Sequence, residues 1–214
     1  MKIDSDINDL SEFIPEASPE HLDLFFKFFE VLCKFNLTVN LVSPESIKNA
    51  GKRHFADSYQ GLRLFLDQAP ANEIIYDFGS GNGFPGVIAA IMKPESQFVL
   101  VERDRRKAEF LRHLSFELGL KNINIHEGNA HQLRDSVVKF GMSRAMAPIP
   151  KFLLELRNCT GSGGVVYLFK GEHWTTEFSN IPPQIFDLWE VDLFGSYTLP
   201  GDVIERYIIR CVRS

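Results

Sequence analysis

The sequence predicts an α/β fold, in which a mostly parallel sheet carries helices on both faces and an all-helical segment precedes it. From Pro70 onward, short apolar runs alternate with amphipathic segments, a pattern typical of parallel strands joined by crossover helices. Residues 1–70, in contrast, show only helix-period patterns. A brief loop separates the last two apolar runs, which favours an antiparallel pair because parallel neighbours need a long crossover.

The first 70 residues are expected to form helices that pack on the sheet. Ser18 and Pro19 are a typical cap and first-turn residue for a helix from about 18 to 35. Ser43 opens a short second helix, and Gly51 separates it from a third, expected from about 52 to 66. One face of the first helix is apolar, and we interpret it as core rather than as a partner groove: Leu22, Phe25, Phe26, Phe29, Leu32 and Cys33.

The region after Pro70 divides into strands and helices in regular alternation. Expected strands cover residues 74–76, 98–101, 123–125, 138–142 and 165–169. Expected helices cover residues 84–92, 105–118 and 149–158, with a short polar helix after the third strand. Two further strand-like runs, 186–193 and 203–212, form the C-terminal pair. We therefore predict an N-terminal helical extension over residues 1–70 and a sheet domain over residues 71–214.

The composition fits one folded domain with a small appendage, since 44% of the 214 residues are hydrophobic and 24% are charged. The net charge of −5 argues against a protein that binds nucleic acid by bulk positive charge. The charge is uneven, however: residues 1–47 hold nine acidic and three basic residues, and residues 48–214 hold 19 and 20. A basic cluster follows the second expected strand, which is compatible with local RNA contact: Arg103, Arg105, Arg106, Lys107 and Arg112.

Several classes of protein are not indicated. The acidic N-terminus lacks the basic and apolar regions of a signal peptide, and no apolar run approaches the roughly 20 residues that cross a bilayer. The three cysteines are far apart and odd in number, which suggests neither disulfides nor a thiolate metal site. His126, Glu127 and His131 miss the spacing of a zinc-protease motif. We expect a cytoplasmic protein with no metal and no membrane contact.

The strongest chemical signal is a glycine-rich turn at residues 77–86, which read Asp-Phe-Gly-Ser-Gly-Asn-Gly-Phe-Pro-Gly. It follows the first expected strand, where glycines let the backbone take positive φ and approach a ligand closely. Glu102 ends the second expected strand, and a carboxylate there can accept both hydroxyls of an adenosine ribose. The turn therefore indicates an adenosine-containing cofactor, and a strand-to-helix turn without a ligand is the lesser alternative.

Two features favour an adenosyl cofactor over a dinucleotide. A dinucleotide fold usually has a second nucleotide-binding half, whereas this chain ends in two adjacent strand-like runs. Asp77 stands two positions before the first glycine, and residues 79–83 have the spacing Gly-x-Gly-x-Gly. In these respects the chain resembles the Rossmann-like fold of S-adenosylmethionine-dependent methyltransferases, in which the last strand is antiparallel. The resemblance implies S-adenosylmethionine as the cofactor.

A narrower resemblance rests on several segments read together: His-Phe-Ala-Asp-Ser at 54–58, the turn with Phe-Pro-Gly at 84–86, Arg-Lys at 106–107 followed by Phe-Leu at 110–111, Ser-Arg-Ala at 143–145 and Lys-Gly at 170–171. From about residue 40 to the last strand, the chain resembles the glucose-inhibited division protein B family, the small-subunit rRNA methyltransferases G. This resemblance implies methyl transfer to N7 of a guanine in 16S rRNA, as naked RNA or in a small-subunit particle. The chain departs from the family pattern at Asn82, where proline is usual, and at His131, where an acidic residue is usual.

The cofactor contacts that the resemblance implies come from three parts of the chain. They are Gly79, Phe84, Ala130, His131 and Arg144. We add Glu102 on the ribose argument given above. Arg144 follows the fourth expected strand, at the sheet edge where ligands collect in open α/β folds, and its fixed charge can hold a cofactor carboxylate or a substrate phosphate.

Substrate contacts are expected at His54, Asp57, Arg144 and Lys170. His54 and Asp57 lie three positions apart on a helix and so share a face, where a helix-to-loop hydrogen bond is their alternative role. Lys170 ends the fifth expected strand, from which a lysine can reach RNA phosphate, although a solvated lysine is the simpler interpretation.

No catalytic residue stands out, because N7 of guanine has a free lone pair and needs no general base. Two alternatives remain open: a non-catalytic S-adenosylmethionine-binding module in regulation or ribosome assembly, and a methyltransferase for a small molecule or a protein. A nicotinamide oxidoreductase is a weaker alternative. We expect the protein to be a monomer.

Overall fold

The computed structural model describes residues 5–135 and 137–214, and the strands in these residues form one seven-stranded sheet. The strands are β1 (Ile74–Phe78), β2 (Gln97–Glu102), β3 (Ile123–Glu127), β4 (Val138–Arg144), β5 (Thr160–Lys170), β6 (Trp189–Tyr197) and β7 (Arg206–Arg213). Their order in the sheet is β3-β2-β1-β4-β5-β7-β6. Neighbours among β1 to β5 run parallel, whereas β7 lies antiparallel to both β5 and β6. The predicted sheet, mostly parallel with an antiparallel last strand, is confirmed.

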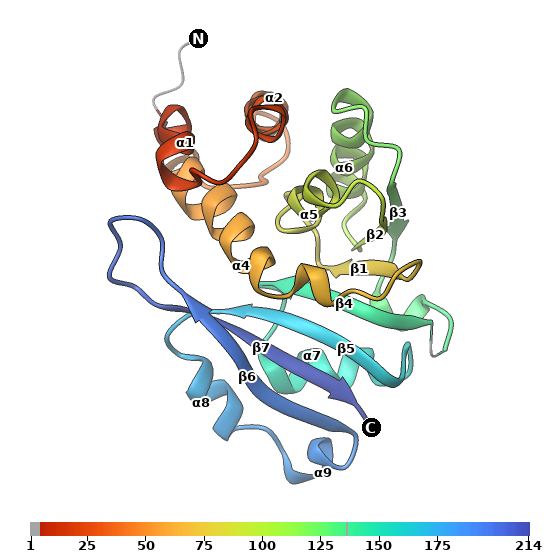
Figure 1. The fold of residues 1–214 in the computed structure, drawn as a ribbon. Helices are drawn as coiled ribbons and strands as arrows, with labels where there is room; N and C mark the ends of the chain where they lie inside the picture. The colour runs from red at the N-terminus through yellow and green to blue at the C-terminus, as the bar shows by residue number, and fades with distance from the viewer. Residues whose placement is uncertain (1–4, 136) are drawn as a thin grey trace.

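Helices cover both sides of this sheet (Figure 1). The N-terminal ones are η1 (Asp6–Asp9), α1 (Leu10–Phe13), α2 (Pro19–Asn36), α3 (Pro44–Lys48), the π-helix η2 (Gly51–Ala56), α4 (Asp57–Phe65) and η3 (Leu66–Gln68). Those between strands are α5 (Gly86–Met92), α6 (Arg105–Glu117), η4 (Ala130–Gln132), α7 (Ile149–Leu156), α8 (Trp174–Ser179) and α9 (Pro183–Phe186). Among the described residues, no helix combines the length and apolar character needed to span a bilayer.

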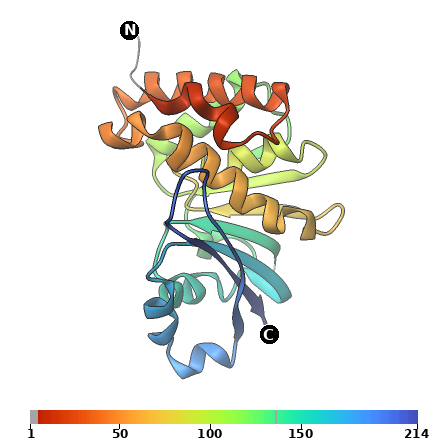
Figure 2. The same cartoon turned by 60° about the vertical axis from the view of Figure 1, so that its left-hand side comes forward.

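Two hydrophobic clusters form the core. One contains Phe25, Phe55 and Phe84 and joins the N-terminal helices to α5, α6 and the sheet. The other contains Phe152 and Trp189 and joins α7 and α9 to the sheet. Figure 1 shows these two groups of helices on opposite sides of the sheet, and Figure 2 shows the N-terminal helices lying together along one side. The N-terminal segment therefore shares its core with α5, α6 and the sheet.

The N-terminal helices differ from the predicted ones in two details. The helix expected from residue 52 begins at Gly51 as a π-helix. The Asp6 carboxylate accepts hydrogen bonds from the first two backbone N–H groups of this helix, those of Gly51 and Lys52, at 2.7 and 3.1 Å. On α2, the predicted Phe26 is only half-buried, whereas Phe28 is completely buried against Phe84. The core face of α2 is thus turned slightly from the expected one.

The C-terminal boundaries also differ from the predicted ones. The fifth strand is longer than expected because Thr160 pairs with Val138, five residues before the predicted start. The run expected as a strand from residue 186 begins to pair only at Trp189, since Pro183–Phe186 form a short helix with proline at its first turn. α8 was not predicted at all.

The sheet edge that carries the site lies at the carboxyl ends of the parallel strands. The strand order reverses between β1 and β4, and open α/β sheets bind ligands outside the carboxyl ends at such a point. β1 ends at Phe78, β4 at Arg144 and β5 at Lys170. Because β7 is antiparallel to β5, its first residue, Arg206, lies at this same edge.

Candidate active site

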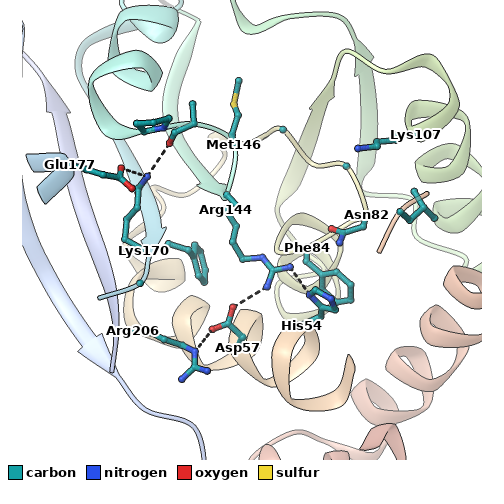
Figure 3. A pocket seen from close by; sticks show the side chains of 18 of the residues that line it. His54, Asp57, Asn82, Phe84, Lys107, Arg144, Met146, Lys170, Glu177 and Arg206 are labelled. Atoms are coloured by element: carbon teal, nitrogen blue, oxygen red, sulfur yellow. Dashed lines mark hydrogen bonds and ion pairs between the residues drawn. The ribbon is translucent and has the colours of Figure 1, made fainter. Parts of the chain in front are cut away.

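A crevice of about 820 Å³ opens at this edge (Figure 3), within the range of small-molecule and cofactor sites. Six residues predicted from the sequence line it: His54, Asp57, Gly79, Phe84, Arg144 and Lys170. They come from η2, α4, the turn after β1 and the ends of β4 and β5. The fold therefore brings together residues that are up to 116 positions apart in the chain, from His54 to Lys170.

The glycine turn forms one wall of the crevice. Gly79, Gly81 and Gly83 have φ values of +73°, +43° and +91°, which side chains other than glycine rarely adopt. A Cβ atom at Gly79 would also lie 2.9 Å from the Cγ atom of Met146, another lining residue. At Gly86, a Cβ atom would lie 2.5 Å from Asp77 Oδ2. Glycine is thus required both by backbone conformation and by close packing.

Glu102 supports this turn from the end of β2. Its Oε2 accepts a hydrogen bond from the Gly81 N–H at 2.8 Å, and its Oε1 accepts one from the Asp104 N–H at 2.8 Å. The side chain is nearly buried, so these backbone donors hold the carboxylate in place. Each oxygen keeps a second lone pair with which to accept a hydroxyl group.

Arg144, at the end of strand β4 next to β1, is the centre of a network of hydrogen bonds in the crevice. Its Nη1 donates to Asp57 Oδ2 at 3.0 Å and to the carbonyl oxygen of Arg53 at 3.1 Å, and its Nη2 lies 3.0 Å from His54 Nδ1. The guanidinium carbon lies 5.4 Å from the centre of the Phe84 ring. With only 14% of its side chain exposed, Arg144 is held rigidly at the crevice wall.

His54 is neutral in this network. Burial, followed by the positive charges of Arg144 and Arg53, lowers the pKa of His54 to about 3. Its ring stacks on Phe84 with centroids 5.2 Å apart. Because Nδ1 accepts from Arg144, the proton belongs on Nε2, which is buried and has no hydrogen-bond partner among the described residues.

The C-terminal hairpin contributes two residues that the sequence did not predict. Tyr197 donates its hydroxyl to Asp57 Oδ1 at 2.9 Å, and Arg206 Nε lies 3.0 Å from the same oxygen. Arg206 also pairs with Asp202 at 2.9 Å. Both carboxylate oxygens of Asp57 are therefore occupied, and the aspartate joins β4, β6 and β7 to α4. The position of Arg206 could have been inferred, since an antiparallel last strand must begin where its parallel neighbour ends.

Lys170 is paired rather than solvated. Its Nζ donates to the carbonyl oxygen of Ala147 at 3.0 Å and to Glu177 Oε2 at 2.7 Å. Glu177 Oε2 also accepts from the backbone N–H of Ile149 at 2.9 Å, at the start of α7. Glu177 was not predicted from the sequence, because it lies on the unexpected helix α8.

The structure places the remaining predicted site residues, Glu102, Ala130 and His131, outside this lining. Ala130 is buried in the second hydrophobic cluster, and His131 borders a separate depression of about 290 Å³ next to α7. Of the basic cluster after β2, Lys107 lines the crevice, whereas Arg112 pairs with Glu127 at 2.8 Å. Among the described residues, no group of three or more His, Cys, Asp or Glu side chains is placed to hold a metal ion.

Comparison with known proteins identifies the family. Residues 21–190 match the GidB family, described as rRNA small subunit methyltransferase G. The chain belongs to this family. Ribosomal RNA small subunit methyltransferase G 3 of Bdellovibrio bacteriovorus is 37% identical over 201 residues, which cover 94% of this chain and 91% of the relative. As a member of the GidB family, the chain is an S-adenosylmethionine-dependent methyltransferase of small-subunit rRNA.

Solved structures show the same fold. A SAM-dependent methyltransferase from Aquifex aeolicus has a TM-score of 0.55 and 14% identity, with 85% of this chain and 98% of that chain covered. A mutant of MtNAS in complex with S-adenosylmethionine has a TM-score of 0.58 and 14% identity, with 98% and 84% covered. At this identity the likeness concerns the fold alone.

The crevice fits the cofactor of the GidB family. Gly79 and Gly81 line the crevice without side chains, so a ligand can approach the backbone of the turn closely at these two positions. Glu102, fixed beside Gly81, has free lone pairs for ribose hydroxyls. Arg144 lines the same crevice, and its fixed positive charge is complementary to a carboxylate.

Proposed function

We propose that this chain transfers a methyl group from S-adenosylmethionine to N7 of a guanine in 16S rRNA, with the Arg144 crevice as the site of reaction. The observation that carries the proposal is the joining of the glycine turn and the Arg144 network at one sheet edge. When bound, the cofactor supplies a methyl group on a positively charged sulfur. The protein's own tasks are to hold the base, orient N7 and exclude water.

The cofactor side of the crevice is proposed to consist of the turn and the residues next to it. Gly79 and Phe84 form the wall, Glu102 accepts the ribose hydroxyls, and Arg144 faces the carboxylate. Ala130 and His131 remain proposed contacts at the end of β3, where backbone groups of η4 lie beyond the crevice lining. No residue of the chain needs to remove a proton, because N7 has a free lone pair.

The substrate side is proposed to consist of the Arg144 network and the Lys170 pair. His54 and Asp57 position Arg144 through hydrogen bonds at 3.0 Å, and Lys170 lies on the neighbouring strand. The partner is 16S rRNA or the small-subunit particle. Since one chain builds the whole crevice, we propose a monomer, acting in the cytoplasm on ribosomal RNA. We also propose residues 1–70 as a helical extension and residues 71–214 as the methyltransferase domain.

The proposed function is tested with small subunits purified from cells that lack this methyltransferase. Incubation with the chain and S-adenosylmethionine is expected to yield N7-methylguanosine in 16S rRNA, detected by mass spectrometry, and none with free guanosine. Arg144→Lys is expected to lower the rate at least tenfold, because an ammonium cannot reach all of the Arg144 acceptors. The exposed Arg105→Lys is the matched control. Cofactor binding without transfer to any ribosomal substrate would establish a non-catalytic module, and transfer to a metabolite alone would establish a small-molecule enzyme.

A further inference from the structure

Two carboxylates line the crevice, those of Asp57 and Glu177, and they differ in how many of their oxygens accept hydrogen bonds. Asp57 accepts hydrogen bonds on both oxygens, from Tyr197 and Arg206 on Oδ1 and from Arg144 on Oδ2. Glu177 uses only Oε2, which accepts from Lys170 and from the Ile149 N–H. In the part of the chain that the structure describes, Glu177 Oε1 has no hydrogen-bond partner. Glu177 is therefore the lining carboxylate with acceptor capacity to spare.

Lys170 has matching donor capacity beside it. An ammonium group has three N–H donors, and Lys170 uses two of them, for the Ala147 carbonyl oxygen and for Glu177 Oε2. Only 11% of the Lys170 side chain and 30% of the Glu177 side chain are exposed, so the pair is held in place within the crevice wall. Figure 3 shows the pair on one side of Arg144 and Asn82 of the glycine turn on the other. The pair presents one donor and one free acceptor side by side.

We propose that the Lys170–Glu177 pair reads the Watson–Crick edge of the target guanine. Glu177 Oε1 accepts from N1–H and from the N2 amino group, and Lys170 donates to O6. The inference rests on guanine as the acceptor base, as proposed above. Enzymes that act on an extruded base read this edge by hydrogen bonds and hold the ring by stacking. Phe169 and Tyr197 line the same crevice as the pair, whereas the ring of Phe84 is already covered by Phe28 and His54.

This arrangement selects guanine and leaves its reactive atom free. Adenine presents a donor at N6 and an acceptor at N1, so its edge would face Lys170 with a donor and Glu177 with an acceptor. A mismatch of this kind leaves polar groups unpaired, which is how sites reject wrong substrates most strongly. N7 lies on the other side of O6 and stays accessible. As N7 gains a methyl group the base becomes cationic, so a carboxylate at N1–H and N2 binds the product-like state more tightly than the substrate.

The test uses inosine, which lacks the N2 amino group but keeps N7, O6 and N1–H. Small subunits are reconstituted with 16S rRNA that carries guanosine or inosine at the modified position, and kcat/KM is measured for both. The wild-type chain is expected to prefer guanosine about tenfold, the usual effect of a hydrogen bond to a charged group. Glu177→Ala is expected to bring this preference close to one, and Glu177→Gln to give an intermediate value.

The readout is a ratio, so a partly unfolded variant still reports it through its residual activity. Glu172→Gln is the matched control, because it removes an exposed carboxylate five positions away that does not line the crevice, and it is expected to keep the wild-type ratio. Equal wild-type rates on guanosine and inosine, or a slow Glu177→Ala variant with an unchanged ratio, would overturn the inference. Absence of N7 methylation by the wild-type chain would instead overturn the proposed function.

Discussion

Arg144 Nη1 lies 3.0 Å from Asp57 Oδ2, although the two residues are 87 positions apart in the chain. The contact joins the last residue of β4 to the first residue of α4, and so connects the parallel sheet to the N-terminal helices. Asp57 also pairs with Arg206 at the start of β7. One carboxylate therefore balances two guanidinium groups from two different strands.

Asp57→Asn is predicted to lower both stability and methyl transfer. The amide keeps the shape of the side chain but loses the charge that balances two nearly buried arginines, so we expect a loss of about 1–3 kcal/mol in the free energy of unfolding. Urea denaturation measures this loss. The control is Asp192→Asn, which breaks an exposed pair with Arg210 and is expected to cost less than about 1 kcal/mol. Equal losses in the two variants would contradict the role assigned to Asp57.

His54→Gln is predicted to reduce the loss of stability in acid. The pKa of His54 is about 3 in the folded protein, against 6.5 when unperturbed, because of burial and the nearby arginines. Between these values the unfolded chain binds more protons, so stability is lost as the pH falls below about 6.5, by at most about 1.4 kcal/mol per pH unit. The free energy of unfolding of wild type minus that of the variant should thus be larger at neutral pH than near pH 5. Urea denaturation at both pH values checks this, and a constant difference would contradict it.

Asp77→Asn is predicted to show the opposite dependence. Burial raises the pKa of Asp77 from 3.8 to about 7, so between these values the folded protein binds more protons than the unfolded chain. The contribution of Asp77 to stability is therefore lost as the pH rises through this window. The variant should be less stable than wild type near pH 5, and the deficit should shrink near pH 8. A deficit that grows with pH in thermal denaturation would refute this sign.

The fold was predictable because local patterns carry it. Parallel strands buried on both faces appear as short apolar runs, and the Ser-Pro starts and the glycine turn mark where elements begin. The region from 172 to 188 lacks such periodicity, and its two short helices depend on tertiary contacts, such as Glu177 with Lys170 and with the start of α7. α8 and α9 were missed for this reason.

The site was predictable only where a local motif marks it. Gly79, Phe84 and Arg144 belong to short segments with their own spacing, and the structure brings all three to one crevice. Tyr197 donates a hydrogen bond to Asp57, 140 positions away in the chain, and no local spacing in the sequence predicts a contact between residues so far apart. The contact depends on the packing of β6 against α4 and on the register that sets Tyr197 opposite Arg206 in the hairpin.

Gly79→Ala is predicted to weaken cofactor binding by more than its cost in stability explains. At φ +73° any side chain is strained by about 1–2 kcal/mol, and here the added Cβ would also lie 2.9 Å from Met146 Cγ, so the wall of the crevice must shift. Calorimetric titration with S-adenosylhomocysteine should show an affinity at least tenfold lower. Gly163→Ala is the matched control, because Gly163 has the same φ of +73° but no atom within 4 Å of the added Cβ. It should lose similar stability and keep full affinity, whereas an equal loss of affinity in both variants would show that backbone strain alone, and not the crevice wall, governs binding.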